Sequence, residues 1–180
     1  MTKFVPKRLD VKAFAEAGTT IKGEQLLRAY PRLFAETDAR GGDTPVEWSA
    51  TGELRNPGHV QPEIWLHLRA DALLPLTCQR CLAPVEIEVE IDRAFRFVSD
   101  EGTAAAEDDE SEEDVLALSR EFDLVALVED EMLMGLPIAP RHETCPEQLP
   151  TAIADADFES PSAQAENPFA ILGRLKTPKS

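Results

Sequence analysis

Four side chains with soft donor atoms form two short clusters in this 180-residue chain. Cys78 and Cys81 make a CxxC pair, and His142 and Cys145 make an HxxC pair that contains the only other cysteine. Two residues between the ligands let a turn direct both donors at one ion, and three thiolates with one imidazole form a closed tetrahedral zinc site. The spacing therefore predicts structural zinc, with no coordination position left open for a substrate.

Two other uses of these thiols stay open. They can be ordinary cysteines without a ligand, or a redox-active CxxC. A redox pair favours the N-terminus of a helix, where the dipole lowers the thiol pKa, whereas residues 82–91 are typical of a turn followed by a strand. Arg80 and Arg141 flank the ligands and could offset the single negative charge that three thiolates leave around a divalent ion.

Alternation of apolar and polar residues predicts a sheet around the first cluster. The pattern holds over residues 47–55, 63–71 and 85–92, and residues 94–98 extend the last strand. Short connections favour antiparallel pairing. The CxxC pair then lies in the connection that precedes the strand from residue 85, and Pro84 marks the exit of the turn.

A helix is predicted between the two clusters, with Asp123 as its N-cap and an end near Gly135. We expect its apolar residues to face the core and its acids to face solvent: Leu124, Leu127 and Val128 inward, and Glu129, Asp130 and Glu131 outward. Pro137 and Pro140 end it. The HxxC pair follows at once, so a bound metal would join the end of the helix to the turn about 60 residues upstream, where closure of a long loop stabilises most.

The expected fold class is α+β, an antiparallel sheet with one principal packing helix, in a single domain over residues 1–145. Residues 100–114 contain nine acids and predict a mobile, solvated acidic loop.

Residues 146–166 are poor in large apolar side chains and predict a linker. Residues 167–176 predict a short C-terminal amphipathic helix that carries Phe169 and Leu172. That helix can dock on the protein's own sheet or insert into a partner's groove.

Charge is unevenly distributed along the chain. The net charge is −16, yet residues 1–40 hold eight Lys and Arg against five acids, a local +3 that leaves −19 for the remainder. Phosphate binding needs clustered cations, so basic proteins are a better electrostatic match for most of this surface than nucleic acid. The acidity can also simply keep the protein in solution.

Two binding modes follow from this distribution. The favoured one is capture of a basic protein by the acidic surface. The alternative is direct contact with RNA through Lys7, Arg8 and Lys12. In that alternative the aromatic side chains among these cations would stack on bases, although they can equally belong to the core: Phe4, Phe14, Tyr30 and Phe34.

Several classes of protein lack their sequence signals here. Residues 1–10 are not followed by the apolar stretch of a secretory signal, and no run approaches the roughly 20 apolar residues of a membrane span. We expect a cytoplasmic protein that does not enter membranes. GxSxG, GxxxxGK[ST], GxGxxG and HExxH are absent from the sequence, which predicts a protein that is not an enzyme and has no small-molecule substrate.

Three ordered motifs resemble one known family. They are Cys78-Gln79-Arg80-Cys81-Leu82, then Asp123-Leu124 to Val128-Glu129-Asp130-Glu131 with Leu136-Pro137 and Pro140, and finally Asn167-Pro168-Phe169-Ala170 to Leu175-Lys176. In order and spacing they are similar to the bacterial YceD family of large ribosomal RNA subunit accumulation proteins. The resemblance implies a role in the accumulation of 23S ribosomal RNA and a link to large-subunit ribosomal proteins. It makes a large-subunit ribosomal protein or a pre-ribosomal particle the expected partner in the favoured binding mode, and ribosomal RNA the expected partner in the alternative. Family members vary around the last His and Cys, so the zinc site is inferred from this sequence.

Overall fold

The computed structural model describes residues 4–60, 62–108 and 110–146. Its helices and strands follow one another in this order: η1 Pro6–Arg8, α1 Val11–Ala17, β1 Thr20–Leu26, η2 Leu27–Ala29, α2 Pro31–Glu36, β2 Pro45–Arg55, β3 Glu63–Thr77, β4 Pro84–Val98, α3 Glu101–Asp108, β5 Asp114–Ala117 and α4 Leu124–Met134.

Five strands form one sheet in the order β1-β2-β3-β4-β5. The first four strands pair with their neighbours in antiparallel register, which confirms the predicted α+β class with a mainly antiparallel sheet. β5 departs from that pattern, because it pairs with β4 in parallel. β3 is longer than its alternation predicted and ends at Thr77, the residue before the CxxC pair, whereas β4 closely matches the predicted strand with its extension over residues 94–98.

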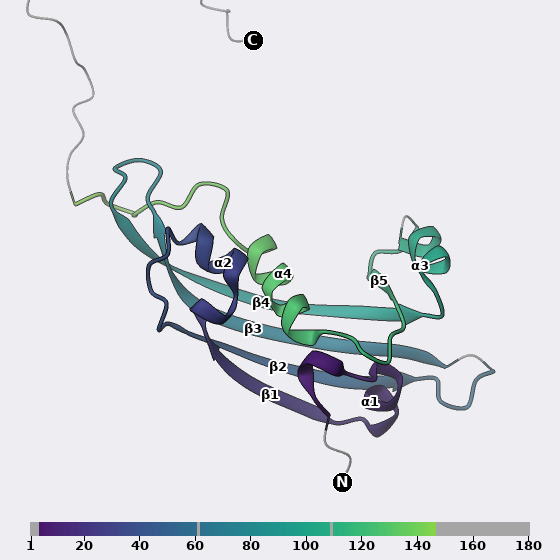
Figure 1. Ribbon diagram of the computed structural model, residues 1–180. Helices are drawn as coiled ribbons and strands as arrows, with labels where there is room; N and C mark the ends of the chain where they lie inside the picture. Colours follow the sequence, from purple (N-terminus) through teal and green to yellow (C-terminus); the bar gives the residue numbers. More distant parts are fainter. Residues whose placement is uncertain (1–3, 61, 109, 147–180) are drawn as a thin grey trace, which may run out of the picture. The chain divides into compact units, whose positions relative to one another are not determined.

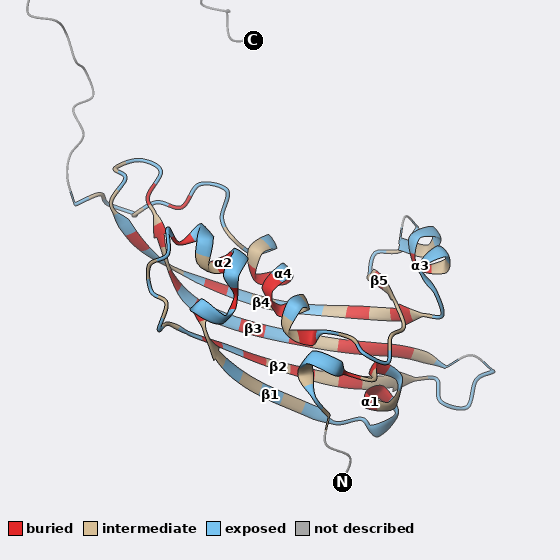
Figure 2. Cartoon of the chain, viewed as in Figure 1, coloured by how far each residue is buried: buried red, intermediate tan, exposed pale blue. Residues whose placement is uncertain are grey.

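Three helices cover one face of the sheet (Figure 1). α1 packs on β2 and β3, α4 packs on β3 and β4, and α2 contacts α4. α1 comes close to β2 because Gly52 has no side chain, and a Cβ there would lie 2.7 Å from the backbone oxygen of Phe14. Figure 2 shows the buried positions along the strands beneath these helices. The apolar residues of β2, β3 and β4 thus form the core with one side of each helix.

α4 begins and ends as predicted, but two of its acids do not face solvent. Asp123 caps the helix by accepting the backbone N–H groups of Val125 and Ala126. Leu124 and Val128 are fully buried, in agreement with the prediction. The outward placement of Glu129 and Glu131 was wrong, since each is only 7% exposed.

Glu129 is buried because it caps the neighbouring helix. The N-cap residue of α2, Tyr30, provides no side-chain hydrogen bond. Instead the carboxylate of Glu129 accepts the backbone N–H of Arg32 at 2.7 Å and that of Leu33 at 3.3 Å. It also accepts the Arg32 guanidinium at 2.9 Å. A long-range contact therefore satisfies helix donors that the local sequence leaves open.

The segment predicted as a mobile, solvated acidic loop, residues 100–114, is not a loop throughout, because it contains α3 and the start of β5. Asp100 accepts the backbone N–H of Thr103 at 3.0 Å and so caps the alanine-rich helix. Arg96 donates to Glu107 at 2.7 Å, and Asp108 accepts the Val115 backbone N–H at 3.0 Å. The Asp100 cap and the contacts of α3 with β4 and β5 offset the repulsion that the density of acids suggested.

The predicted linker beyond Pro146 and the predicted helix 167–176, with Phe169 and Leu172, lie outside the described residues. The division into a domain over 1–145 and a tail stays a prediction. Within the described part of the chain, no helix combines the length and the apolar character needed to cross a bilayer.

Candidate metal centre and partner surfaces

The β3–β4 hairpin turn positions the CxxC pair. Cys78 follows β3 directly, and its backbone N–H donates to the carbonyl of Ala83 at 2.9 Å. The backbone N–H of Leu82 closes the turn by donating to the Cys78 carbonyl at 2.8 Å, and Leu82 adopts a left-handed conformation with φ of 60°. This turn holds Cys78, which is fully buried, and Cys81 on one side of the hairpin tip.

The segment after α4 brings the HxxC pair to the same turn. The carbonyl of Pro140 accepts the backbone N–H of Gln79 at 2.8 Å, which joins this segment to the hairpin. His142 and Cys145 follow at once. The donor atoms of the four predicted ligands all lie within 4.8 Å of one another.

The distances between the donor atoms suit a tetrahedral ion. Tetrahedral zinc with Zn–S of about 2.3 Å and Zn–N of about 2.05 Å would place two sulfurs about 3.8 Å apart and a sulfur and a nitrogen about 3.6 Å apart. The sulfurs of Cys78 and Cys145 are 3.9 Å apart. The sulfur of Cys81 is 3.5 Å from Nδ1 of His142. The pairs thus match a shared zinc ion, whereas a disulfide needs sulfurs about 2.05 Å apart.

The hydrogen bond of His142 leaves the correct nitrogen available for a metal. Nε2 lies 3.0 Å from the carbonyl oxygen of Pro84. A carbonyl can only accept, so Nε2 carries the proton and the lone pair of Nδ1, 3.5 Å from the Cys81 sulfur, is left for a metal. This arrangement, with the second ring nitrogen bonded to a backbone carbonyl, is the usual support of a metal-binding histidine.

The surroundings of the cluster favour a thiolate at Cys78 but not at Cys81. Burial raises the pKa of Cys78, but backbone N–H groups of Cys81, His142 and Arg80 outweigh it and lower that pKa to about 5. At Cys81 the backbone N–H of Ala83 lowers the pKa, but burial and the neighbouring sulfurs of Cys145 and Cys78 outweigh it, so that pKa is raised. Arg80 donates its Nε–H to the Cys145 sulfur at 3.0 Å, and its NH2 group donates to the carbonyl of His142 at 2.9 Å.

The two flanking arginines therefore differ. Arg80 supports the cluster with both charge and hydrogen bonds, as its position in the sequence indicated. Arg141 is exposed, and none of the contacts among the described residues joins it to the cluster. Of the two arginines, only Arg80 lies where it could offset the negative charge that three thiolates would leave around a divalent ion.

One of the three predicted RNA-binding cations is already paired within the chain. Lys7, Arg8 and Lys12 are exposed, and Arg8 forms an ion pair with Glu121. Arg28 pairs with Asp43 at 2.5 Å in the same way. Two of the aromatic candidates, Phe14 and Tyr30, are buried in the core. The other two, Phe4 and Phe34, are partly buried against it.

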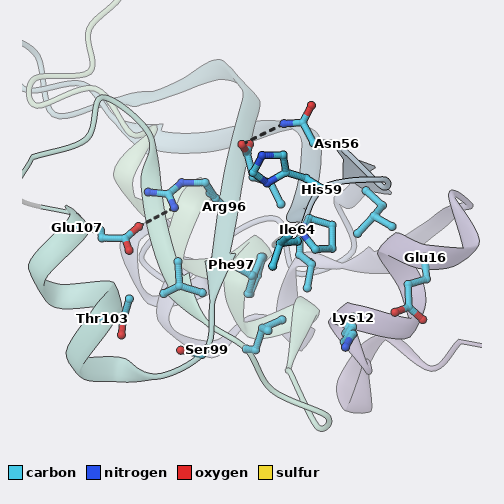
Figure 3. A pocket seen from close by; sticks show the side chains of 16 residues that line it. Lys12, Glu16, Asn56, His59, Ile64, Arg96, Phe97, Ser99, Thr103 and Glu107 are labelled. Atoms are coloured by element: carbon cyan, nitrogen blue, oxygen red, sulfur yellow. Dashed lines mark hydrogen bonds and ion pairs between the residues drawn. The ribbon is translucent and has the colours of Figure 1, made fainter.

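A hollow of about 860 Å³ lies at the end of the sheet beside the β2–β3 hairpin (Figure 3). Lys12 and Glu16 of α1 border one side, and Thr103 and Glu107 of α3 border the other. Glu107 is engaged by Arg96 at 2.7 Å. The charged groups here come from opposite rims and do not meet at a common point, so the hollow suggests no reaction centre.

The alternation along single strands did not reveal a row of acidic residues across the sheet. An acid from each of four adjacent strands stands in one register row across the sheet, on the face away from the helices. We call these residues the carboxylate row: Glu24, Glu47, Asp71 and Glu90. Alternation reveals that each acid faces outward, but only the pairing of the strands brings the four into line.

Together, the fold and the clusters define a class: a small acidic α+β protein in which a Cys3His cluster links a hairpin turn to the end of the packing helix. The chain belongs to the YceD family, because the family model described as large ribosomal RNA subunit accumulation protein YceD matches residues 66–176. This confirms the resemblance carried by the three motifs.

A curated relative agrees with that assignment. The large ribosomal RNA subunit accumulation protein YceD of Haemophilus influenzae is 30% identical over 104 residues. The alignment covers 56% of this chain and only 59% of the relative. No solved structure matches the chain significantly.

Proposed function

We propose that this protein supports the accumulation of 23S ribosomal RNA as a non-catalytic, cytoplasmic factor that binds a basic ribosomal component. Family membership supports the ribosomal role, since relatives carry that role in their name. The partner would be a large-subunit ribosomal protein or a pre-ribosomal particle that contains one. A net charge of −16 favours a cationic partner and speeds its association.

The observation that carries the proposal is the internal neutralisation of the basic N-terminal segment. Of its eight cations, four pair with acids within the described part of the fold: Arg8 with Glu121, Arg28 with Asp43, Arg32 with Glu129 and Asp130, and Arg40 with Asp38. A phosphate backbone would have to compete with these carboxylates. The surface that remains available to a partner is therefore mainly acidic.

Direct binding of ribosomal RNA is the competing hypothesis, and the side chains argue against it. Exposed aromatic rings would be needed as stacking platforms, but Phe14 and Tyr30 are buried. Lys7 and Lys12 are exposed, yet two or three cations supply few of the phosphate contacts on which such affinity depends.

We further propose that Cys78, Cys81, His142 and Cys145 bind one structural zinc ion. The tetrahedral donor spacing, the His142 tautomer and the Arg80 hydrogen bond to Cys145 support it. Four protein ligands fill the coordination sphere, so the ion would hold the hairpin turn against the segment after α4 and would not activate water. Metal analysis of protein purified without chelator should give about one equivalent of zinc, and a value far below one would exclude the site.

Affinity purification from cells with and without nuclease tests the ribosomal role. We expect a large-subunit protein to remain bound after nuclease treatment. Loss of every ribosomal partner on nuclease treatment would favour the RNA hypothesis instead. A Lys7→Glu/Lys12→Glu variant should capture the same proteins as the unaltered chain, because the basic segment is not the contact surface in our proposal.

A further inference from the structure

The face of the sheet opposite the helices is uncovered in the described part of the chain (Figure 1). On the outward positions of β1 to β4, nine acids stand against four Lys and Arg. Leu73 on this face is 49% exposed. An antiparallel sheet can keep one face in solvent, but this face is far from neutral.

The carboxylate row is the most concentrated part of that charge. Glu24 stands opposite Glu47, Glu47 opposite Asp71, and Asp71 opposite Glu90. All four side chains are exposed. Side chains directly opposite on neighbouring strands lie within interaction distance, and like charges in these positions destabilise a sheet.

Some other acids on the same face have cationic neighbours. Arg69 stands opposite Asp92 and pairs with it at 3.1 Å. Glu53 pairs with both Arg55 at 3.1 Å and His67 at 2.6 Å. Among the described residues, no cation forms an ion pair with any member of the carboxylate row. Glu86 and Glu88 of β4 lie on the same face and also lack an ion pair among the described residues, so the unpaired acids extend from the row along β4.

A shallow hollow adjoins the row. Three members of the row, those on β1, β2 and β3, line a shallow hollow of about 440 Å³. Lys22, Ser49 and Arg69 line its other side, and Arg69 is held by Asp92. A partner cation would thus meet a concave carboxylate surface and not an isolated charge.

We propose that the open face docks a Lys- or Arg-bearing helical segment of a basic protein across β1 to β4, with its cations on the carboxylate row. This inference rests on the proposed function and names the surface that performs it. Strands are about 4.8 Å apart, so the row extends over roughly 14 Å. A helix with cations at i, i+3, i+7 and i+10 places them over about 15 Å.

Binding of defined peptides tests the proposal. The probe is a 14-residue alanine-based peptide with Lys at positions 2, 5, 9 and 12, and its control has the same four Lys together at one end. We expect the full-length protein to bind the spaced peptide at least about 5-fold more tightly than the clustered one at low salt. Equal affinity for the two peptides would overturn the proposed register.

A pair of charge-matched variants separates the row from net charge. The row variant is Glu24→Gln/Glu47→Gln/Asp71→Asn/Glu90→Gln. The control removes four exposed acids from the 101–113 segment: Glu101→Gln, Glu110→Gln, Glu112→Gln and Glu113→Gln. We expect the row variant to lose about 10-fold or more in affinity for the spaced peptide and the control to lose less than about 2-fold. Equal losses would reduce the effect to bulk charge and overturn the site.

Thermal unfolding distinguishes a lost surface from a lost fold. Because the row places like charges opposite one another, its neutralisation should raise Tm while binding falls. A lower Tm would mean that the acids stabilise the sheet, which contradicts the proposal. Binding of single-stranded RNA instead of the peptide would also overturn it. Failure of the row variant to alter capture of ribosomal proteins would reject this surface, whereas loss of all capture by the unaltered protein would reject the proposed function itself.

Discussion

Carboxylates on the two sides of the sheet differ in burial and in their partners within the chain. On the covered face, Glu129 is only 7% exposed but has a hydrogen bond from the backbone N–H of Arg32 and an ion pair with its guanidinium. On the open face, the four exposed acids of the carboxylate row have no cationic partner within the described residues.

The difference separates acids that stabilise the fold from acids that are available to a partner. A buried carboxylate must be paired within the chain because its desolvation is costly. An exposed row can stay unpaired at a small cost in stability and can then be paired by another molecule. The Cys3His cluster resembles the buried carboxylate, because in the proposed site its thiolates would be paired within the protein by the zinc ion.

Loss of a ligand of the proposed zinc site should have the largest effect. Cys78→Ser removes a fully buried ligand and is expected to lower the free energy of unfolding by about 3 kcal/mol or more, because structural zinc is bound chiefly by the folded state. Differential scanning calorimetry measures this. A chelator should lower the Tm of the unaltered protein and leave the Tm of Cys78→Ser unchanged.

Arg141→Gln is the control for that substitution, since Arg141 is exposed beside the ligands without joining them. Its effect should stay within about 0.5 kcal/mol. A chelator-insensitive Tm in the unaltered protein would contradict a structural ion.

Removal of the cap between α4 and α2 should have the next largest effect. Glu129→Ala leaves the N-terminal N–H groups of α2 and the Arg32 guanidinium without their acceptor, and should cost about 2–3 kcal/mol. Urea unfolding gives the value. Asp130→Ala removes the neighbouring ion pair with Arg32. Because the Asp130 side chain is half exposed, this loss should cost less than about 1 kcal/mol. Equal costs would show that Glu129 acts only as one more surface charge.

A reversed charge within the row should have a smaller effect of the opposite sign. Glu47→Lys places a cation between Glu24 and Asp71 and should stabilise the sheet by about 0.5–1 kcal/mol. Glu86→Lys makes the same change on the same face, but opposite Pro75, and should stabilise less. If Glu47→Lys destabilised the protein, the account of an unbalanced row would fail.

The pH dependence of Glu131 should give the smallest effect. Burial raises the pKa of Glu131 above its ordinary value of 4.5, and Arg93 lowers it only in part. The folded state therefore holds this proton more tightly than the unfolded state, so stability is lost as pH rises from 4.5 through the raised pKa. Glu131→Gln has no carboxyl group to ionise at this position, so this loss of stability with rising pH should be absent. The variant should gain Tm relative to the unaltered protein between pH 4 and pH 7, and a pH-independent difference would contradict the assignment.

The sequence predicted those parts of the fold that depend on local patterns. Alternation located β2, β3 and β4, and the Asp123 cap with its apolar spacing located α4. The loop prediction for residues 100–114 failed because it considered only the density of acids. It did not include contacts with other elements, such as that of Arg96 with Glu107. The parallel pairing of β5 also depends on a register that short-range patterns do not contain.

The same distinction holds for the candidate sites. Ligand spacing was sufficient to group Cys78, Cys81, His142 and Cys145, because each cluster lies within four residues. The role of Glu129 could not be found this way, since its partners Arg32 and Leu33 are almost 100 positions away. The carboxylate row likewise depends on three strand registers at once.

The central claim is that the open face carries the ribosomal role, and 23S ribosomal RNA levels in cells that lack this gene test it most directly. Such cells would receive the unaltered chain, the row variant or the charge-matched 101–113 variant at equal protein abundance. We predict that the unaltered chain and the 101–113 variant restore the ribosomal RNA level and that the row variant does not. Full restoration by the row variant would contradict the account.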